Sequence, residues 1–203
     1  MTWVKVCGMT SSEAVEATVD GGADAMGFVL APRSVRALTL DRARALAEGV
    51  PIATFIVTVD LSPGEALEAA EYVGVTGIQA HGDRSLDVAA EAIDAGYLSI
   101  SPIPVGSGGA LVDVSEVPRL SVPLFDTASS VVHGGTGTVF DWSQMPDVGR
   151  PFILAGGLGP ENVSAAIDAV DPFGVDASSR LESKPGVKDV SRIVAFIQEA
   201  KLK

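Results

Sequence analysis

The sequence predicts a (β/α)8 TIM barrel, in which eight parallel strands close into a ring that helices surround. Eight short apolar runs recur along the 203 residues, and short apolar runs are typical of parallel strands buried on both faces. Segments with helical spacing lie between most of these runs, as parallel neighbours require. The length also fits, because minimal barrels begin at roughly 200 residues.

The eight apolar runs are spaced along the whole chain. The first begins near Val4, and the others are Ala25–Leu30, Ala53–Val57, Gly77–Gln79, Tyr97–Ile100, Val122–Phe125, Phe152–Ala155 and Gly174–Val175. An open doubly wound sheet is the alternative, but it has no need of eight strands. No shift in composition marks a boundary, so we expect residues 1–203 to form a single barrel domain.

Six segments have the alanine-rich, amphipathic spacing of helices. They are residues 12–20, 40–48, 65–72, 86–94, 162–170 and 191–200. The pattern Thr10-Ser-Ser-Glu13 predicts a capping box at the start of the first helix. Pro160, directly after Gly159, suits the first turn of a later helix.

The fifth strand–helix unit is irregular. Pro102, Pro104 and the segment Gly106–Gly109 interrupt it, and only Asp113–Val117 could form a short helical turn. We therefore expect the fifth helix of the barrel to be shortened or missing.

Composition excludes several classes of protein. With 47% hydrophobic and 20% charged residues, the chain has the balance of a globular protein. A net charge of −12 argues against nucleic-acid or anionic-membrane partners. No run approaches the roughly 18 apolar residues of a membrane span. A single cysteine and the absence of a visible signal peptide favour a cytoplasmic location.

Active sites in this fold lie at the C-terminal ends of the strands, where Cys7 and Asp126 follow the first and sixth runs. A helix N-terminus near Cys7 can lower the pKa of its thiol. Desolvation can raise the pKa of Asp126 and keep it protonated. A base and an acid across one pocket suit a proton-transfer isomerase. A small buried hydrophobe and a helix cap are the alternative roles of these two residues.

Loops after the seventh and eighth runs predict a phosphate cradle. Gly156 and Gly157 lead into a helix, and Asp176-Ala-Ser-Ser179 follows the next strand. Backbone N–H groups at these places commonly bind phosphate. Arg36 is the best candidate for a planar fork to a carboxylate, with a solvated surface arginine as the alternative.

Metal binding is not expected. His81 and His133 are far apart and have no partner at ligand spacing; His81 instead packs or hydrogen-bonds in the site. The glycine-rich segment Gly134–Gly137 lacks the strand–turn–helix spacing of a dinucleotide site. We expect that loop to be mobile without substrate and ordered by it, with Trp142 packing against it.

Motifs along nearly the whole chain match one known family. They are Val4–Thr10, Gly22–Phe28, Ser34–Arg36, Gln79–Asp83, Phe125–Thr127, Gly134–Gly137, Phe140–Trp142, Leu154–Leu158, Asn162–Val163, Gly174–Ser179 and Pro185–Asp189. With these motifs the chain resembles the phosphoribosylanthranilate isomerases of tryptophan biosynthesis. The first motif and the glycine-rich segment are highly specific in combination.

The resemblance implies an aldose–ketose isomerisation, the Amadori rearrangement of N-(5-phosphoribosyl)anthranilate to 1-(2-carboxyphenylamino)-1-deoxyribulose 5-phosphate, without a cofactor. The family's acid matches Asp126, which would protonate the furanose ring oxygen. Its base matches Cys7, which would remove the C2 proton. Its arginine for the anthranilate carboxylate matches Arg36.

The resemblance also implies a small phosphorylated and carboxylated substrate, bound by a monomer or a homodimer. The family's phosphate loops match Gly156, Gly157, Ser178 and Ser179, while Asp176 lines the mouth.

Three places depart from the family pattern. Val35 replaces the usual proline, Ile56–Val59 replaces a strand ending in which asparagine is common, and Arg180-Leu-Glu182 replaces glycine-valine-glutamate. Arg180 either strengthens anion binding or pairs with Glu182.

Two alternative functions stay open at this point. A dual-substrate isomerase of the histidine and tryptophan pathways would use paired aspartates, and Cys7 argues against it. A non-catalytic sugar-phosphate-binding barrel is disfavoured because both Cys7 and Asp126 are retained.

Overall fold

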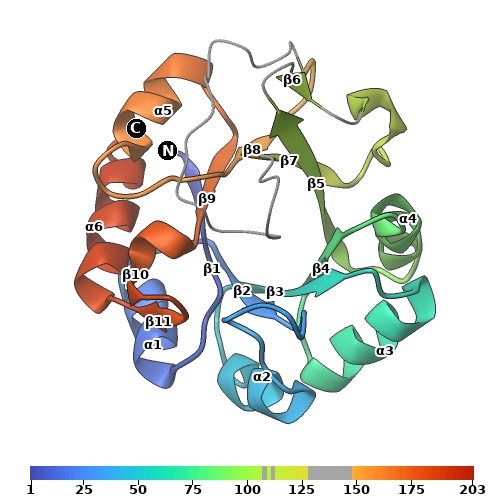
Figure 1. The fold of residues 1–203 in the computed structure, drawn as a ribbon. Coiled ribbons are helices and arrows are strands. Elements are labelled where there is room, and N and C mark those ends of the chain that lie inside the picture. The colour runs from blue at the N-terminus through green and yellow to red at the C-terminus, as the bar shows by residue number, and fades with distance from the viewer. Residues whose placement is uncertain (107–108, 111–112, 128–147) are drawn as a thin grey trace.

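The computed structural model describes residues 1–106, 109–110, 113–127 and 148–203. Eight parallel strands form its centre (Figure 1): β1 (Trp3–Cys7), β2 (Ala25–Val29), β3 (Ala53–Val59), β4 (Gly77–His81), β5 (Leu98–Gly106), β7 (Val122–Thr127), β8 (Ile153–Leu154) and β9 (Gly174–Ala177). Each strand pairs with the next, and β9 pairs with β1, so the sheet closes on itself. The predicted (β/α)8 barrel is confirmed.

Helices cover the outside of the barrel, as the ribbon view shows (Figure 1). The described residues contain α1 (Ser12–Asp20), α2 (Leu40–Ala47), α3 (Pro63–Val73), α4 (Ser85–Asp94), α5 (Val163–Val170) and α6 (Val190–Lys201). Each corresponds to one of the six segments with helical spacing. Their small apolar residues, many of them alanine, pack on outward-facing strand residues such as Val4, Val6 and Ile56.

In the described part of the fifth unit, one 3-10 turn, η1 (Val114–Glu116), lies between β5 and β7, in agreement with the expected shortening. The prolines, however, do not interrupt the strand, because β5 runs through Pro102 and Pro104. Pairing with β4 ends at Ile100, and from Ser101 to Pro104 β5 pairs only with β7. A strand with one free side tolerates proline, which has no N–H to donate there.

Two local predictions about helix starts are wrong. The N-cap of α1 is Ser11, whose side chain accepts from Ala14 N, while the Thr10 hydroxyl donates to the Gly186 carbonyl. Pro160 lies in the turn before α5, whose N-cap is Asn162. At the first helix, a tertiary contact with Gly186 occupies the Thr10 hydroxyl that the pattern assigned to the cap. At the later helix, Pro160 belongs to a turn that precedes the first helical residue.

The C-terminal part of the chain adds small elements at the barrel mouth. After β9 come the 3-10 turn η3 (Ser179–Leu181) and a hairpin of β10 (Glu182–Lys184) and β11 (Val187–Lys188). A two-residue strand, β6 (Gly109–Ala110), pairs with β5.

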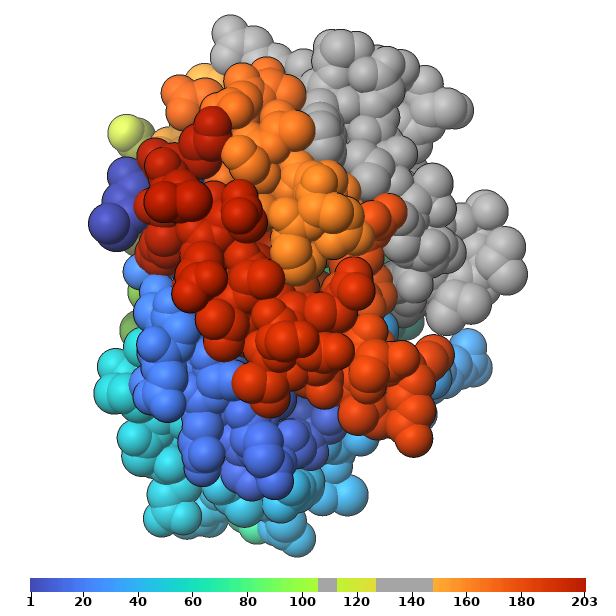
Figure 2. All heavy atoms as spheres, turned by 90° about the vertical axis from the view of Figure 1, so that its left-hand side faces the viewer, coloured from blue at the N-terminus to red at the C-terminus, as the bar shows by residue number. Residues whose placement is uncertain are grey.

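The two ends of the chain meet on one side of the barrel. Figure 2 shows the red C-terminal segment lying against the blue N-terminal one. Lys201 at the end of α6 donates to the Thr2 carbonyl at 3.0 Å and pairs with Asp24 at 2.5 Å. These contacts join the last helix to the first two strands. No helix among the described residues has the length and apolar character to cross a bilayer.

Candidate active site

Side chains of β1 alternate between the barrel interior and the helices. Trp3 packs against an inner cluster that includes Phe55 and Leu124 from other strands. Residues two apart on a strand share a face, so Lys5 and Cys7 also face the interior. Phe55 and Leu124 are apolar and close the lower part of the barrel, whereas the upper part towards the mouth holds polar groups.

Lys5 and Asp176 form a buried ion pair in this upper part. They are register partners on β1 and β9, and Lys5 Nζ lies 3.1 Å from Asp176 Oδ1. Lys5 is fully buried. Burial alone would lower the pKa of Lys5, but the Asp176 carboxylate and Cys7 outweigh it and raise that pKa. Lys5 is therefore a buried ammonium group.

Cys7 lies at the end of β1 and is only 7% exposed, against Val29 and Val57. Burial raises the pKa of its thiol, the charge of Lys5 opposes the rise, and Asp176 adds to it. The expected lowering by a helix N-terminus is therefore wrong. α1 begins five residues later and is capped by Ser11, and the dipole effect fades within one turn of the helix end.

Asp126 lies near the end of β7, opposite Pro104 of β5 in register. It shares the inward face of Leu124, two residues before it, and is half-buried. In the closed sheet, β9 and β8 separate β1 from β7. The thiol and the carboxyl group therefore lie at the same mouth of the barrel, on strands that are not neighbours, and both are directed inward.

Arg36, in the loop after β2, is held by a carboxylate rather than by solvent. It is 9% exposed, and its Nε and Nη2 donate to the two oxygens of Glu182 at 2.5 and 3.0 Å. Its stem lies over Gly8, where an added Cβ would be 2.6 Å from Arg36 Cδ. A solvated surface arginine is excluded. In the described part of the chain, Nη1 makes no hydrogen bond and is available to a ligand.

Lys188 of the hairpin links Arg36 to the loop after β9. Its buried Nζ donates to Ser178 O at 2.8 Å and Ser178 Oγ at 3.2 Å, and lies 3.1 Å from Glu182 Oε1. Burial lowers the pKa of Lys188 although Glu182 opposes this. Burial works against ionisation of Glu182, but bonds from Arg36 and the charge of Lys188 prevail and lower its pKa. Ser178, and Ser179 beside it, thus lie next to fixed positive charge.

The turn after β8 has the backbone form that a phosphate cradle needs. Gly156 and Gly157 have φ values of +86° and +65°, a region that side chains disfavour. Asn162 holds this turn by accepting from Gly159 N at 2.8 Å and donating to Gly157 O at 3.0 Å. The two glycines can therefore present backbone groups to a ligand.

His81 ends β4 and faces inward at the mouth. Its Nε2 lies 3.1 Å from Nε2 of Gln79. Gln79 is buried, and its Oε1 has no hydrogen-bond partner among the described residues. A buried amide oxygen without a donor is costly.

Several polar residues of the site were not predicted from the sequence. Lys5 could have been found from strand alternation, because it lies two residues before Cys7. Glu182 carries no local signal, because its partner Arg36 is 146 positions away. Lys188 was missed because the hairpin is what folds it back onto Glu182 and Ser178. Arg180 does not pair with Glu182, which Arg36 and Lys188 already hold. It pairs with Glu161 at 2.8 Å on the surface.

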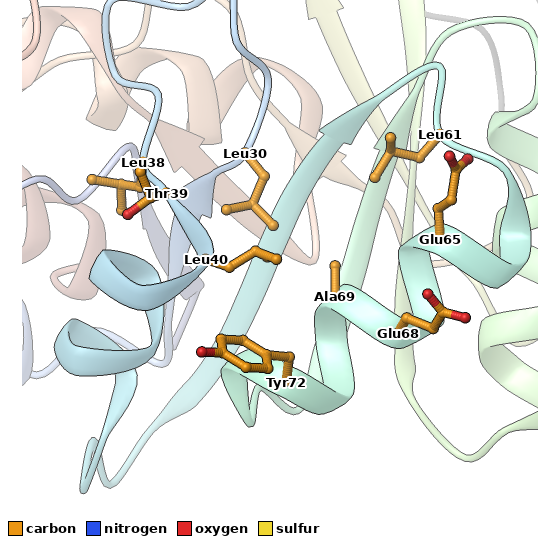
Figure 3. A pocket seen from close by; sticks show the side chains of 9 residues that line it. All are labelled: Leu30, Leu38, Thr39, Leu40, Leu61, Glu65, Glu68, Ala69 and Tyr72. Atoms are coloured by element: carbon orange, nitrogen blue, oxygen red, sulfur yellow. The ribbon is translucent and has the colours of Figure 1, made fainter.

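Other predicted features lie away from this mouth or outside the described residues. His133, Gly134–Gly137 and Trp142 fall in the undescribed range. Where side chains are described, no three metal-binding groups come together. A separate groove lies on the outer wall between α2 and α3 (Figure 3), lined mainly by leucines and by Glu65 and Glu68. It contains none of the predicted site residues.

These features define a class of protein. A closed (β/α)8 barrel carries a thiol, a carboxyl group, an arginine fork and a glycine turn at the C-terminal ends of its strands. This is the end at which enzymes of this fold place their active sites. The protein is a barrel enzyme whose site combines anion-binding groups with candidates for proton transfer.

Comparison with known proteins gives the family. Residues 4–199 match the family model described as N-(5'phosphoribosyl)anthranilate (PRA) isomerase. The N-(5'-phosphoribosyl)anthranilate isomerase of Rubrobacter xylanophilus is 38% identical over 99% of this chain and 100% of its own. The phosphoribosyl anthranilate isomerase structure from Thermus thermophilus has a TM-score of 0.85 and 30% identity, covering all of both chains.

A second solved structure is a phosphoribosyl anthranilate isomerase in complex with reduced 1-(o-carboxyphenylamino)-1-deoxyribulose 5-phosphate. It has a TM-score of 0.79 and 32% identity, again over all of both chains. The chain therefore belongs to the N-(5'-phosphoribosyl)anthranilate isomerase family.

Proposed function

We propose that this protein isomerises N-(5-phosphoribosyl)anthranilate to 1-(2-carboxyphenylamino)-1-deoxyribulose 5-phosphate, a step of tryptophan biosynthesis. The observation that carries the proposal is the placement of Cys7, Asp126 and Arg36 at one barrel mouth, in a chain that matches the family over residues 4–199. No cofactor is needed, because the reaction only moves protons within one molecule.

Asp126 and Cys7 divide the proton transfers between them. Asp126 gives a proton to the ring oxygen, and the C1–O bond breaks to leave an iminium ion at C1. Cys7, as thiolate, takes the C2 proton, and the C2–H electrons form the C1–C2 double bond of an enaminol. The enol proton leaves oxygen as C1 gains one, which gives the ketone. The acid loses one proton and the base gains one, so the overall reaction is an isomerisation.

The other mouth residues bind the two anionic ends of the substrate. Nη1 of Arg36 binds the anthranilate carboxylate, since Glu182 occupies the opposite side of the guanidinium. Gly156, Gly157, Ser178 and Ser179 bind the phosphate, with Lys188 beside them. Asp176 and His81 line the space between these ends. The product analogue bound to a relative of 32% identity supports a ligand with both anions here.

The test is a fluorescence assay with pure protein, in which the substrate signal disappears on isomerisation. We expect turnover by the wild type and loss of most of it in Cys7→Ser and Asp126→Asn, because each change keeps the volume but removes the base or the acid. Circular dichroism and thermal melting check that both variants fold. Turnover at the wild-type rate in either variant would contradict the role of that residue.

The same preparation separates the alternatives. A non-catalytic barrel would bind the reduced product analogue in calorimetry but would not consume substrate. A dual-substrate isomerase would also convert the histidine-pathway aminoaldose, whereas a thiol base in place of a second aspartate predicts conversion of the anthranilate substrate alone. Dialysis against a chelator leaves turnover unchanged if no metal takes part.

A further inference from the structure

Lys5 is a fully buried cation that the proposed proton transfers do not use. Its Nζ is 3.1 Å from Asp176 Oδ1, deep in the barrel. Removing two charges from water costs free energy that their attraction often does not recover, and an apolar pair of similar size would often be at least as stable. The position of Lys5 therefore calls for a reason other than stability.

The sulfur of Cys7 lies beside this ammonium group. Both side chains leave the same face of β1, two residues apart, and both extend over Gly27 of β2. A Cβ added to Gly27 would lie 2.9 Å from Cys7 Sγ and 3.3 Å from Lys5 Nζ. Because Gly27 has no side chain, Cys7 Sγ and Lys5 Nζ can both lie over it. A side chain at position 27 would clash with the sulfur and crowd the ammonium group.

Few groups from the described part of the chain surround the sulfur. Gly27, Val29 and Val57 face it from β2 and β3, and none of them titrates. The charged groups that act on it are Lys5 on β1, Asp176 on β9 and Lys188 on β11. Lys5 is the positive charge on the sulfur's own strand that can stabilise a thiolate at Cys7.

We propose that Lys5 is a positioning residue for Cys7: its buried ammonium group, fixed by Asp176, lies against the sulfur and compensates the negative charge of the thiolate. The inference rests on the proposed function only in giving that thiolate the role of base. Lys5 keeps its own proton throughout. The thiol proton leaves to solvent before the reaction, and the C2 proton later arrives on the sulfur.

The pKa directions of Cys7 and Lys5 agree with this arrangement. Burial raises the pKa of Cys7, while the charge and a hydrogen bond of Lys5 oppose the rise and Asp176 adds to it. The pKa of Lys5 is itself raised, so the ammonium persists where the thiol ionises. Removal of Lys5 and removal of the Asp176 charge should therefore shift the Cys7 titration in opposite directions.

The experiment titrates Cys7 directly in the intact, substrate-free protein. The chain has one cysteine, so a ¹³Cβ-cysteine label gives a single NMR signal whose shift follows thiol ionisation. We expect Lys5→Met to raise the Cys7 pKa by about 1–3 units, the usual effect of an adjacent opposite charge. We expect Asp176→Asn to lower it. The second variant keeps the test decisive if the first does not fold.

Lys201→Met is the matched control, because it removes another Lys–Asp pair, with Asp24, away from the site. It should leave the Cys7 pKa unchanged. In the activity assay, the break in the pH profile of kcat/KM that is due to Cys7 should move by the same amount as the NMR titration in each variant. A Cys7 pKa that is the same in wild type, Lys5→Met and Asp176→Asn would overturn the proposal. Because the NMR titration needs no turnover, that result is distinct from a failure of the isomerase assignment.

Discussion

The thiol of Cys7 lies in surroundings that oppose its ionisation. Its pKa is raised above the ordinary value of 9.0 by burial, despite the nearby ammonium of Lys5. At neutral pH the free enzyme therefore holds Cys7 mostly as the thiol, and the thiolate that the proposed mechanism needs is the minority form. A small change in the charges near Cys7 changes the fraction of thiolate, and we expect the turnover rate to change in the same direction.

The pH dependence of Cys7 alkylation tests this property of one residue. Because only the thiolate is alkylated and the pKa is raised, the rate constant for reaction of the substrate-free protein with iodoacetamide should increase about tenfold per pH unit from pH 7 to pH 9. Quenched samples analysed by mass spectrometry, in buffers of constant ionic strength, measure it. A rate constant that is flat across this range would mean that Cys7 is already ionised.

Residues of the site divide into those with a local signal and those without. Cys7, Asp126 and the glycine pair could be predicted because each directly follows an apolar run, and the run fixes which end of the barrel it reaches. Lys5 and Glu182 act through partners that only the tertiary fold brings near, such as Arg36 with Glu182, 146 positions apart, and Lys188 reaches Glu182 through the hairpin. The raised pKa of Cys7 was also missed, because it depends on burial by other strands.

Gly27 of β2 lies directly beside Cys7 of β1, where a larger residue would crowd the thiol. Gly27→Ala places a methyl group 2.9 Å from Cys7 Sγ. We expect it to cost about 1–3 kcal/mol of unfolding free energy, as overpacking does, and to reduce kcat. Urea denaturation and the turnover assay measure both effects.

Gly64→Ala is the matched control for that substitution. Gly64 lies in the first turn of α3, and an added Cβ there meets nothing within 4 Å. It should keep full activity and stability, with a gain of up to about 1 kcal/mol from the lower chain entropy of alanine. Equal losses in the two variants would show that the crowding at Gly27 does not matter.

At the scale of elements, the β10–β11 hairpin orients the loop that carries Arg36. Glu182 holds Arg36 and Lys188, and the hairpin tip approaches the loop so closely that a Cβ on Gly186 would be 2.5 Å from the Val35 carbonyl oxygen. The substituted position Val35 is itself exposed. The hairpin, rather than a proline at position 35, therefore restricts the conformation of the loop that carries Arg36.

Glu182→Gln tests the hairpin. It leaves two buried cations without their carboxylate, so we expect a loss of about 3–5 kcal/mol in unfolding free energy at pH 7 and a raised KM. The folded-state pKa of Glu182 is lowered, so its stabilisation is present above the unfolded pKa and is lost as pH falls through the folded value. The difference between wild type and variant should therefore shrink below about pH 4.3.

Glu161→Gln provides the comparison, since Glu161 pairs with Arg180 at the surface and such pairs are worth about 0–1 kcal/mol. Urea titrations of both variants at several pH values give the two differences. A loss in Glu182→Gln no larger than that in Glu161→Gln would contradict the role of the hairpin.

For the whole molecule, the fold could be predicted from the eight apolar runs that recur along the chain. Eight buried strands with crossovers have one closed arrangement in a chain of this length, and β4–β5 and β1–β9 pairing completes it. The path of β5 through Pro102 and Pro104 could not be predicted, because it depends on β5 having a single partner from Ser101 to Pro104. The N-cap at Ser11 likewise follows from the contact of Thr10 with the distant Gly186.

The central claim is that one barrel mouth holds the base, the acid and both anion sites around a single substrate. A crystal structure of this protein with the reduced product analogue tests it most directly. We predict Cys7 and Asp126 on opposite sides of the sugar chain, the carboxylate at Arg36, and the phosphate at the loops of Gly156 and Ser178. An analogue bound in the groove between α2 and α3, or bound at the mouth without contact to Cys7, would contradict the claim.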